Sequence, residues 1–196
     1  MLSLESKYEK ELGISTSRIK KSDDQDNFHY QAASYLSLLK VLDRLPMHLK
    51  NEGFIDYGCG KGRALFCAER NGFNHLIGID LDHELLVKAE ENLSTYSGKR
   101  AGSSFKFSNE NALTYEIPEG TGTFYFFNPF SEKVMSEVAN RVVNYSNTTK
   151  QKVYVVYLNP KYKSVWTNAG FTIEEEIKTR FYTEALIYSY TPANYR

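Results

Sequence analysis

The chain has 196 residues, of which 41% are hydrophobic and 24% charged, and its 24 basic and 24 acidic residues give a formal net charge of zero. A chain of this length is expected to form one domain with a substantial buried core, and its neutral balance disfavours nucleic acid as a partner. No segment approaches the roughly 20 apolar residues of a membrane span. The two cysteines, Cys59 and Cys67, are too few for a disulfide framework or a structural zinc site, so we expect a soluble cytoplasmic protein.

Helical patterns dominate the first part of the chain. A short helix is expected at 3–12 within a polar region of mixed charge, and apolar residues recur at helical spacing over 28–50, ending near Pro46. We therefore predict an N-terminal helical arm over 1–50 and a main domain over 51–196, which together form one structural unit.

Strand and helix patterns alternate through the main domain. We expect helices at 62–71, 82–95 and 131–145, and strands at 54–57, 75–80, 104–108, 123–128 and 152–158. The last of these strands is continuously apolar, as in a parallel strand covered on both faces. After a short helix within 161–169, two further strands follow at 171–177 and 181–190. The order predicts an α/β protein: a Rossmann-like three-layer sandwich with a seven-stranded, mostly parallel sheet and an antiparallel C-terminal hairpin strand.

A glycine-rich loop follows the first strand of this sheet. Asp56 lies near the end of the strand, and three alternating glycines come next, at Gly58, Gly60 and Gly62. Glycines let a backbone approach a ligand closely and adopt positive φ. The second strand ends in Asp80, a carboxylate that can accept hydrogen bonds from both hydroxyls of a ribose. The pattern predicts a site for a nucleoside-bearing cofactor.

The spacing of the loop discriminates between cofactors. A dinucleotide site typically has the spacing G-x-G-x-x-G, with the pyrophosphate on the helix N-terminus. Here the glycines are spaced G-x-G-x-G, and the carboxylate of Asp56 would repel a pyrophosphate. A ligand with a cationic ammonium group suits this loop better. S-adenosylmethionine carries an ammonium, a sulfonium and a ribose but no phosphate.

The segment Asp56-Tyr-Gly-Cys-Gly-Lys-Gly62 resembles the first motif of the class I S-adenosylmethionine-dependent methyltransferases, and Ile77-Gly-Ile-Asp-Leu-Asp82 resembles their second. The resemblance implies that the glycine loop, Cys59 included, passes under the methionine moiety of the cofactor. It also implies that Asp80 binds the ribose and that Leu81 packs against the adenine.

The third element of that family is similar to Ser108-Asn-Glu-Asn111-Ala112. The resemblance implies that Asn111 accepts a hydrogen bond from the adenine amino group, beside the small residue Ala112. The family more commonly has Asp-Ala at this point, so Glu110 or Asn109 is an alternative to Asn111.

The predicted fourth strand ends in Asn128-Pro129-Phe130. This tripeptide resembles the Asn/Asp-Pro-Pro-Tyr/Phe motif of class I methyltransferases that modify nitrogen, although the second proline is missing. The resemblance implies that the amide oxygen of Asn128 and a backbone carbonyl orient the target amine, while the ring of Phe130 stacks on the substrate. The alternative is that Asn128 and Pro129 simply end the strand and turn the chain into the helix that begins near Ser131.

Several other residues are secondary candidates. Related enzymes often fold an N-terminal segment over the cofactor, so we expect the arm to act as a lid. Within it, Tyr30 or Gln31 could contact the methionine carboxylate, as could Lys61 or Arg63 of the loop; otherwise Tyr30 packs in the core and the two basic residues stay solvated. The histidines have no metal-ligand spacing, and we expect no metal site.

The sequence thus predicts an S-adenosylmethionine-dependent methyltransferase that modifies nitrogen in a protein side chain or a small amine. The glycine loop and the Asn-Pro-Phe tripeptide together resemble a group of small bacterial methyltransferases whose substrates are largely unassigned. Two alternatives remain: a non-catalytic cofactor-binding or scaffold protein with the same fold, and, disfavoured by the glycine spacing, a dinucleotide-dependent oxidoreductase.

Overall fold

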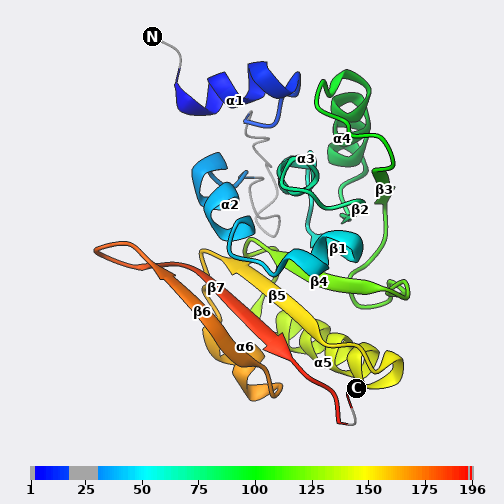
Figure 1. Cartoon of the computed structure of the whole chain (residues 1–196), viewed down its shortest axis with the longest axis vertical. Coiled ribbons are helices and arrows are strands. Elements are labelled where there is room, and N and C mark those ends of the chain that lie inside the picture. Colours follow the sequence, from blue (N-terminus) through cyan, green and yellow to red (C-terminus); the bar gives the residue numbers. More distant parts are fainter. Residues whose placement is uncertain (1–2, 18–30, 194, 196) are drawn as a thin grey trace.

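The computed structural model describes residues 3–17, 31–193 and 195 (Figure 1). Within these residues, seven strands form one sheet in the order β3-β2-β1-β4-β5-β7-β6. The strands are β1 (Gly53–Tyr57), β2 (His75–Ile79), β3 (Ser104–Ser108), β4 (Thr121–Phe126), β5 (Val153–Leu158), β6 (Thr172–Lys178) and β7 (Thr183–Tyr190). The helices are α1 (Leu4–Leu12), α2 (Tyr35–Leu42), the 3-10 helix η1 (Met47–Asn51), α3 (Arg63–Arg70), α4 (His83–Thr95), α5 (Glu132–Thr149) and α6 (Lys163–Asn168).

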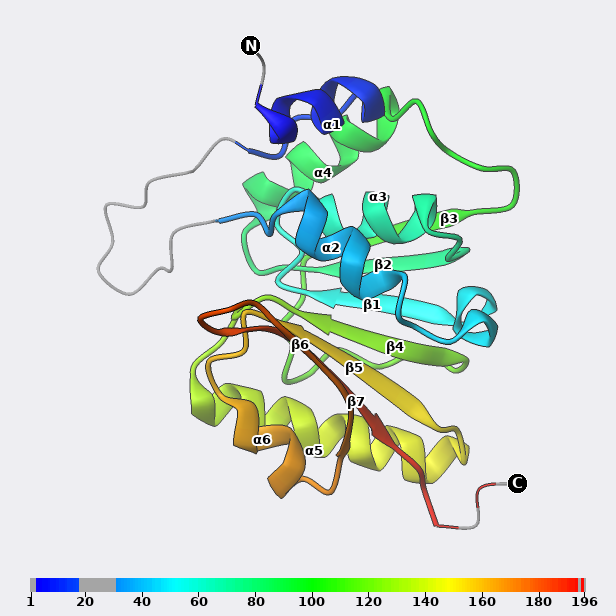
Figure 2. The same cartoon turned by 60° about the vertical axis from the view of Figure 1, so that its left-hand side comes forward.

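The topology is that of a doubly wound sheet. Strands β1 to β5 pair in parallel, whereas β7 is antiparallel to both of its neighbours, β5 and β6. Helices α2, α3 and α4 cover one face of the sheet, and α5 and α6 cover the other (Figure 2). The chain reverses its direction of winding between β1 and β4, and in such folds ligands bind at the carboxyl ends of the strands beside this point.

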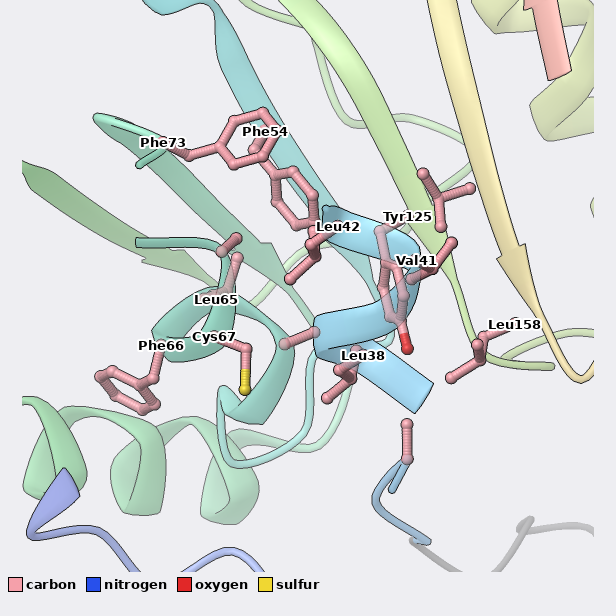
Figure 3. Close-up of a cluster of buried hydrophobic side chains, with 14 of the residues drawn as sticks. Leu38, Val41, Leu42, Phe54, Leu65, Phe66, Cys67, Phe73, Tyr125 and Leu158 are labelled. Atoms are coloured by element: carbon pink, nitrogen blue, oxygen red, sulfur yellow. The ribbon is translucent and has the colours of Figure 1, made fainter. Parts of the chain in front are cut away.

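The core has one hydrophobic cluster on each face of the sheet. Figure 3 shows the cluster under α2 and α3, where Leu38 and Leu42 of α2 approach Phe54 and Tyr125 of the sheet. Phe54 also packs edge-on against Phe73, with ring centroids 4.9 Å apart. This aromatic packing fixes the strands from which the site is built. No helix among the described residues is both long and apolar enough to cross a membrane.

The structure confirms the predicted sheet and corrects some element boundaries. Strand β4 ends at Phe126 rather than at residue 128 because Asn128 adopts a positive φ of 47°. The predicted helix over 28–50 is shorter: α2 ends at Leu42, and the chain resumes after Pro46 as the 3-10 helix η1. Proline cannot continue the backbone hydrogen bonds of a helix, which explains the break. The arm residues 18–30, Tyr30 among them, lie outside the described residues.

A buried arginine joins the N-terminal segment to the main domain. Arg63, the first residue of α3, is 5% exposed, and all five of its N–H groups have partners. The guanidinium donates to Glu5, Glu9, Thr16, Ser17 and the carbonyl of Ala33, at 2.5–3.3 Å. It also lies 4.3 Å from the centre of the Tyr35 ring. The sequence left Arg63 either bound to the cofactor or solvated, but here it anchors the arm.

We predict that Arg63→Lys loosens the arm without unfolding the sheet. Lysine keeps the charge but cannot make the planar five-donor pattern, so we expect the free energy of unfolding to fall by about 3 kcal/mol. Amide hydrogen exchange should accelerate in α1 while β1 and β4 stay protected. The matched control is Arg70→Lys, on the same helix, because Arg70 pairs with Glu11 of α1 but is 45% exposed. Equal effects of the two substitutions would contradict the anchoring role.

Candidate functional site

The glycine loop lies between the ends of β1, β2 and β4. Gly58, Gly60 and Gly62 have φ values of 79°, 52° and 83°, in the region that favours glycine. A Cβ atom at Gly58 would lie 2.6 Å from the Cβ of Pro129. The predicted cofactor loop and the Asn128-Pro129 turn are therefore in direct contact, and only glycine fits between them.

The loop is tied to the end of β2 by hydrogen bonds. The backbone N–H groups of Gly58 and Cys59 both donate to the carbonyl of Ile79, at 2.8 and 3.1 Å. The N–H of Gly60 donates to one carboxylate oxygen of Asp80 at 2.8 Å, and the N–H of Asp82 donates to the other at 2.9 Å. The orientation of the Asp80 carboxylate is thus fixed by the backbone of the loop and of its own strand end.

Cys59 takes part in the site through its backbone, whose N–H group donates to Ile79. Its side chain is 5% exposed, and a Cβ atom at Gly78 would lie 2.7 Å from its sulfur. Burial raises the pKa of the thiol well above its usual value, so the thiol stays protonated and unreactive.

Asp56 is a buried carboxylate on the face of the sheet covered by α2 and α3. It is 3% exposed, and β4 places Tyr125 directly beside it in register. Burial raises the pKa of Asp56 well above its usual range, and the charge of Asp80 raises it further. Burial also raises the pKa of Asp80, against the lowering effect of its backbone hydrogen bonds. Because the charge of Asp80 opposes the ionisation of Asp56, this pair of carboxyl groups favours a cationic ligand and disfavours a phosphate.

The residues predicted around the adenine include an exposed apolar side chain. Leu81 is 68% exposed. The side-chain amide of Asn109 donates to the carbonyls of Asp80 and Leu81, at 3.0 and 2.9 Å, and so holds the backbone of that segment. Asn111 is exposed, with its amide oxygen accepting from the N–H of Leu113 at 2.9 Å, and Ala112 is buried beside it.

Asn128 joins two adjacent strand ends. Its amide oxygen accepts from the Tyr157 hydroxyl at 2.7 Å and from the N–H of Lys161 at 3.2 Å, and its amide nitrogen donates to the carbonyl of Asn159 at 2.5 Å. An amide oxygen has two acceptor positions, so both are filled in this arrangement. Asn159 also precedes a proline and also has a positive φ, 49°.

Phe130 is partly buried, with its ring edge-on to that of Tyr57 at 6.5 Å between centroids. The sequence did not point to Tyr157 as part of the site, because its partner Asn128 lies 29 residues away along the chain. Lys61 is buried rather than solvated, and its carbonyl accepts from Asn92 at 3.1 Å.

No group of metal-ligating side chains occurs among the residues that the structure describes.

A cavity of about 470 Å³ lies next to the turns that follow β4 and β5, on the side of α2. Its wall includes Phe127 and Asn159 from the strand ends, Arg63 from α3, and Tyr182 and Glu184 from β7 and the turn before it. Arm residues complete the wall: Glu5, Ser17 and Gln31. The cavity is therefore placed where a second substrate could approach the end of β4.

No family model matches this chain. It is 37% identical over 76 residues to a ribosomal protein L11 methyltransferase of Polynucleobacter necessarius subsp. necessarius (strain STIR1), a match that covers 39% of this chain and about a fifth (19%) of that protein. Matches to solved structures extend over more of the chain but have lower identity.

A methyltransferase of Methanosarcina mazei described as S-adenosylmethionine-dependent superposes with a TM-score of 0.58 at 14% identity, covering 79% of this chain and 98% of that one. Magnesium protoporphyrin IX methyltransferase of Synechocystis PCC 6803, solved with bound S-adenosylmethionine, gives 0.57 at 15% identity, covering 81% and 78%. A ribosomal protein L11 methylase of Lactobacillus delbrueckii subsp. bulgaricus gives 0.54 at 15%, covering 78% and 75%. The chain thus has the Rossmann-like fold of these methyltransferases.

We predict that Asp56 costs the protein stability at neutral pH. A carboxyl group whose pKa is raised by folding binds its proton more tightly in the folded state, so stability falls as pH rises from about 3.9, the unfolded value, through the raised folded pKa. In Asp56→Asn this contribution disappears. The free energy of unfolding, measured in urea from acidic to neutral pH, should therefore decrease less with pH in the variant than in the wild type. Parallel pH profiles would contradict the raised pKa.

Proposed function

We propose that the protein is an S-adenosylmethionine-dependent methyltransferase. The observation that carries the proposal is a pair of carboxylates, the buried Asp56 and the partly buried Asp80, on either side of a three-glycine loop at the topological switch point. The pair suits the ammonium of a methionine moiety and opposes a pyrophosphate, which separates this cofactor from a dinucleotide. The shared fold with solved methyltransferases supports the same conclusion.

We propose that the predicted residues bind the cofactor along its whole length. In the proposed site, Gly58, Cys59, Gly60 and Gly62 pass under the methionine moiety, and Asp56 balances its ammonium. Asp80 receives the ribose hydroxyls on the acceptor positions that Gly60 and Asp82 leave open. The exposed side chain of Leu81 covers one face of the adenine, with Asn111 and Ala112 at its edge. We propose that the arm, which lines the neighbouring cavity through Glu5, Ser17 and Gln31, closes over the site as a lid.

The reaction proposed at this site is methyl transfer to nitrogen. The cofactor supplies a methyl group made electrophilic by the sulfonium. Transfer forms a nitrogen–carbon bond and breaks the carbon–sulfur bond, whose electron pair stays on sulfur, while the amine loses one proton to solvent. The protein's task is to hold the amine in line with the bond that breaks.

We propose that Asn128, Pro129 and Phe130 provide this alignment. Because Tyr157 and Lys161 occupy the amide oxygen of Asn128, an incoming amine must displace one of them or use the backbone carbonyls of the turn. The partly buried ring of Phe130 offers a face to the positive charge that develops on nitrogen. The partial match to a ribosomal protein L11 methyltransferase favours a protein side chain as acceptor over a small amine. A scaffold without activity is the second candidate, and it predicts cofactor binding without transfer.

We predict that Asp80→Asn weakens S-adenosylhomocysteine binding about tenfold or more, since the amide offers one acceptor oxygen instead of two and brings a donor toward the N–H of Gly60 or Asp82. Calorimetry measures the affinity. The matched control is Asp82→Asn, because Asp82 is the N-cap of α4 and asparagine caps equally well. The assignment would be refuted if Asp80→Asn bound S-adenosylhomocysteine as tightly as the wild type. It would also be refuted if the wild-type protein bound NAD and not S-adenosylhomocysteine.

We predict that Asn128→Ala lowers methyl transfer by more than about tenfold while S-adenosylhomocysteine affinity stays within about twofold, because the residue holds the acceptor side of the site. Transfer of a labelled methyl group to proteins of a cell lysate provides the measurement. Tyr157→Phe is the companion variant: it removes only one donor to Asn128 and should retain most activity. Loss of both affinity and transfer in Asn128→Ala would indicate a purely structural residue.

A further inference from the structure

The turn between β6 and β7 exposes two adjacent aromatic side chains. Phe181 is 86% exposed, the highest value among the large hydrophobic residues that the structure describes, and Tyr182 is 59% exposed. We call residues 179–182 the hairpin tip. It projects outward from the sheet in Figure 1. Neighbouring exposed apolar groups with a polar surround are typical of interaction sites.

The hairpin tip is held in one conformation by its own hydrogen bonds. The N–H of Thr179 donates to the carbonyl of Tyr182 at 2.9 Å. The hydroxyl oxygen of Thr179 accepts from the N–H groups of Phe181 and Tyr182, at 3.3 and 3.2 Å. Ordered groups lose less conformational entropy when a partner binds them. The two aromatic rings are therefore presented on a prepared surface.

The position of the hairpin tip connects it to the proposed acceptor cavity. Leu158, the last residue of β5, pairs with Ala185 of β7, so the tip lies beyond the carboxyl end of β5. Tyr182 lines the cavity together with Asn159. The N–H of Asn159 also donates to the carbonyl of Glu184 at 2.7 Å. A partner bound to Phe181 would therefore lie next to Tyr182, which lines the cavity.

The charges around the cavity separate into an outer and an inner group. Outside are Lys161, Lys163, Lys178 and Arg180; Lys178 pairs with Glu176 at 2.8 Å, and Lys163 donates to the hydroxyl of Thr183 at 2.6 Å. Lys161 and Arg180 lie 5.2 and 5.7 Å from the ring centres of Tyr162 and Phe181, and across the described ranges neither has a carboxylate partner. We expect their positive charges to attract an anionic group on a partner.

The inner wall of the cavity carries carboxylates. Glu184 lines it, and the hydrogen bond from Lys40 lowers the pKa of Glu184, which keeps the group ionised. Glu5 also lines the cavity and forms an ion pair with Arg63. Basic side chains therefore lie beside the cavity, and its lining includes two carboxylates, of which Glu184 pairs with Lys40 and Glu5 pairs with Arg63.

We propose that the methyl acceptor is a protein segment in which a side-chain amine is flanked by acidic residues. The inference rests on the proposed function and assigns its substrate class. The acidic flanks bind Lys161 and Arg180, an apolar group of the segment packs on Phe181, and the amine enters the cavity past Tyr182 toward Glu184. A nucleic acid fits less well, because the carboxylates of Glu184 and Glu176 lie near the path of its phosphates.

Fluorescence polarisation of labelled peptides tests the inference on the full chain saturated with S-adenosylhomocysteine. One peptide has a lysine flanked on both sides by aspartates and a leucine, and a second has alanines in place of the aspartates. We expect the acidic peptide to bind about tenfold more tightly, which corresponds to ~1.4 kcal/mol. The double variant Lys161→Glu/Arg180→Glu should abolish this preference, and Phe181→Ser should weaken both peptides.

The control variants are Met47→Ser, which removes another exposed apolar side chain (79%) from η1, and Lys99→Glu, which reverses an exposed charge before β3. Both should bind the peptides as the wild type does. Equal affinity for the two peptides in the wild type would overturn the inference, as would a preference that survives the double variant. Tighter binding of a single-stranded RNA that depends on the hairpin tip would overturn it in favour of a nucleic acid.

The same samples separate this inference from the proposed function. S-adenosylhomocysteine binding is measured first, by calorimetry, in the wild type and in each variant. Normal cofactor binding with no peptide preference would overturn only the substrate class. Absence of cofactor binding in the wild type would overturn the proposed function and, with it, the assignment of the peptide as a methyl acceptor.

Discussion

The buried guanidinium of Arg63 is the interaction on which the arrangement of the site depends. A charge with 5% exposure is tolerable only when every donor has a partner, and here the partners come from α1, from Thr16 and Ser17 after it, and from Ala33 ahead of α2. Arg63 directly follows the last glycine of the loop. The conformation of the loop and the docking of the arm are therefore coupled through one side chain. A change in the loop is expected to alter the docking of the arm, and the reverse.

The rest of the site is assembled from strand ends that hydrogen-bond to one another. The loop is tied to Ile79 and Asp80 of β2, and Pro129 packs on Gly58. Asn128 binds the end of β5, and Asn159 binds β7 through Glu184. These contacts run across the sheet from the proposed cofactor side to the cavity. The proposed cofactor site and the proposed acceptor site would thus be held at a fixed separation by backbone and amide groups rather than by flexible charged side chains.

Much of the fold followed from local patterns, and the reasons for the exceptions are physical. The alternation of apolar strands and amphipathic helices located all seven strands, because each pattern is contained within a few consecutive residues. The glycines and carboxylates of the loop were found for the same reason. The partners of Arg63 are 30 to 58 residues away along the chain, and Tyr157 is 29 residues from Asn128, so no local pattern reveals them. The helix over 28–50 was overestimated because the apolar spacing extends to Leu45, whereas α2 ends at Leu42, four residues before Pro46.

The burial of Asp56 also has a calorimetric consequence. Folding raises its affinity for a proton, and a cationic ligand bound beside it stabilises the ionised form instead. Binding of such a ligand would therefore release protons to the buffer at pH values between the pKa of Asp56 in the complex and its raised pKa in the free protein. The observed heat then contains the ionisation heat of the buffer, and its variation from one buffer to another gives the net number of protons released on binding.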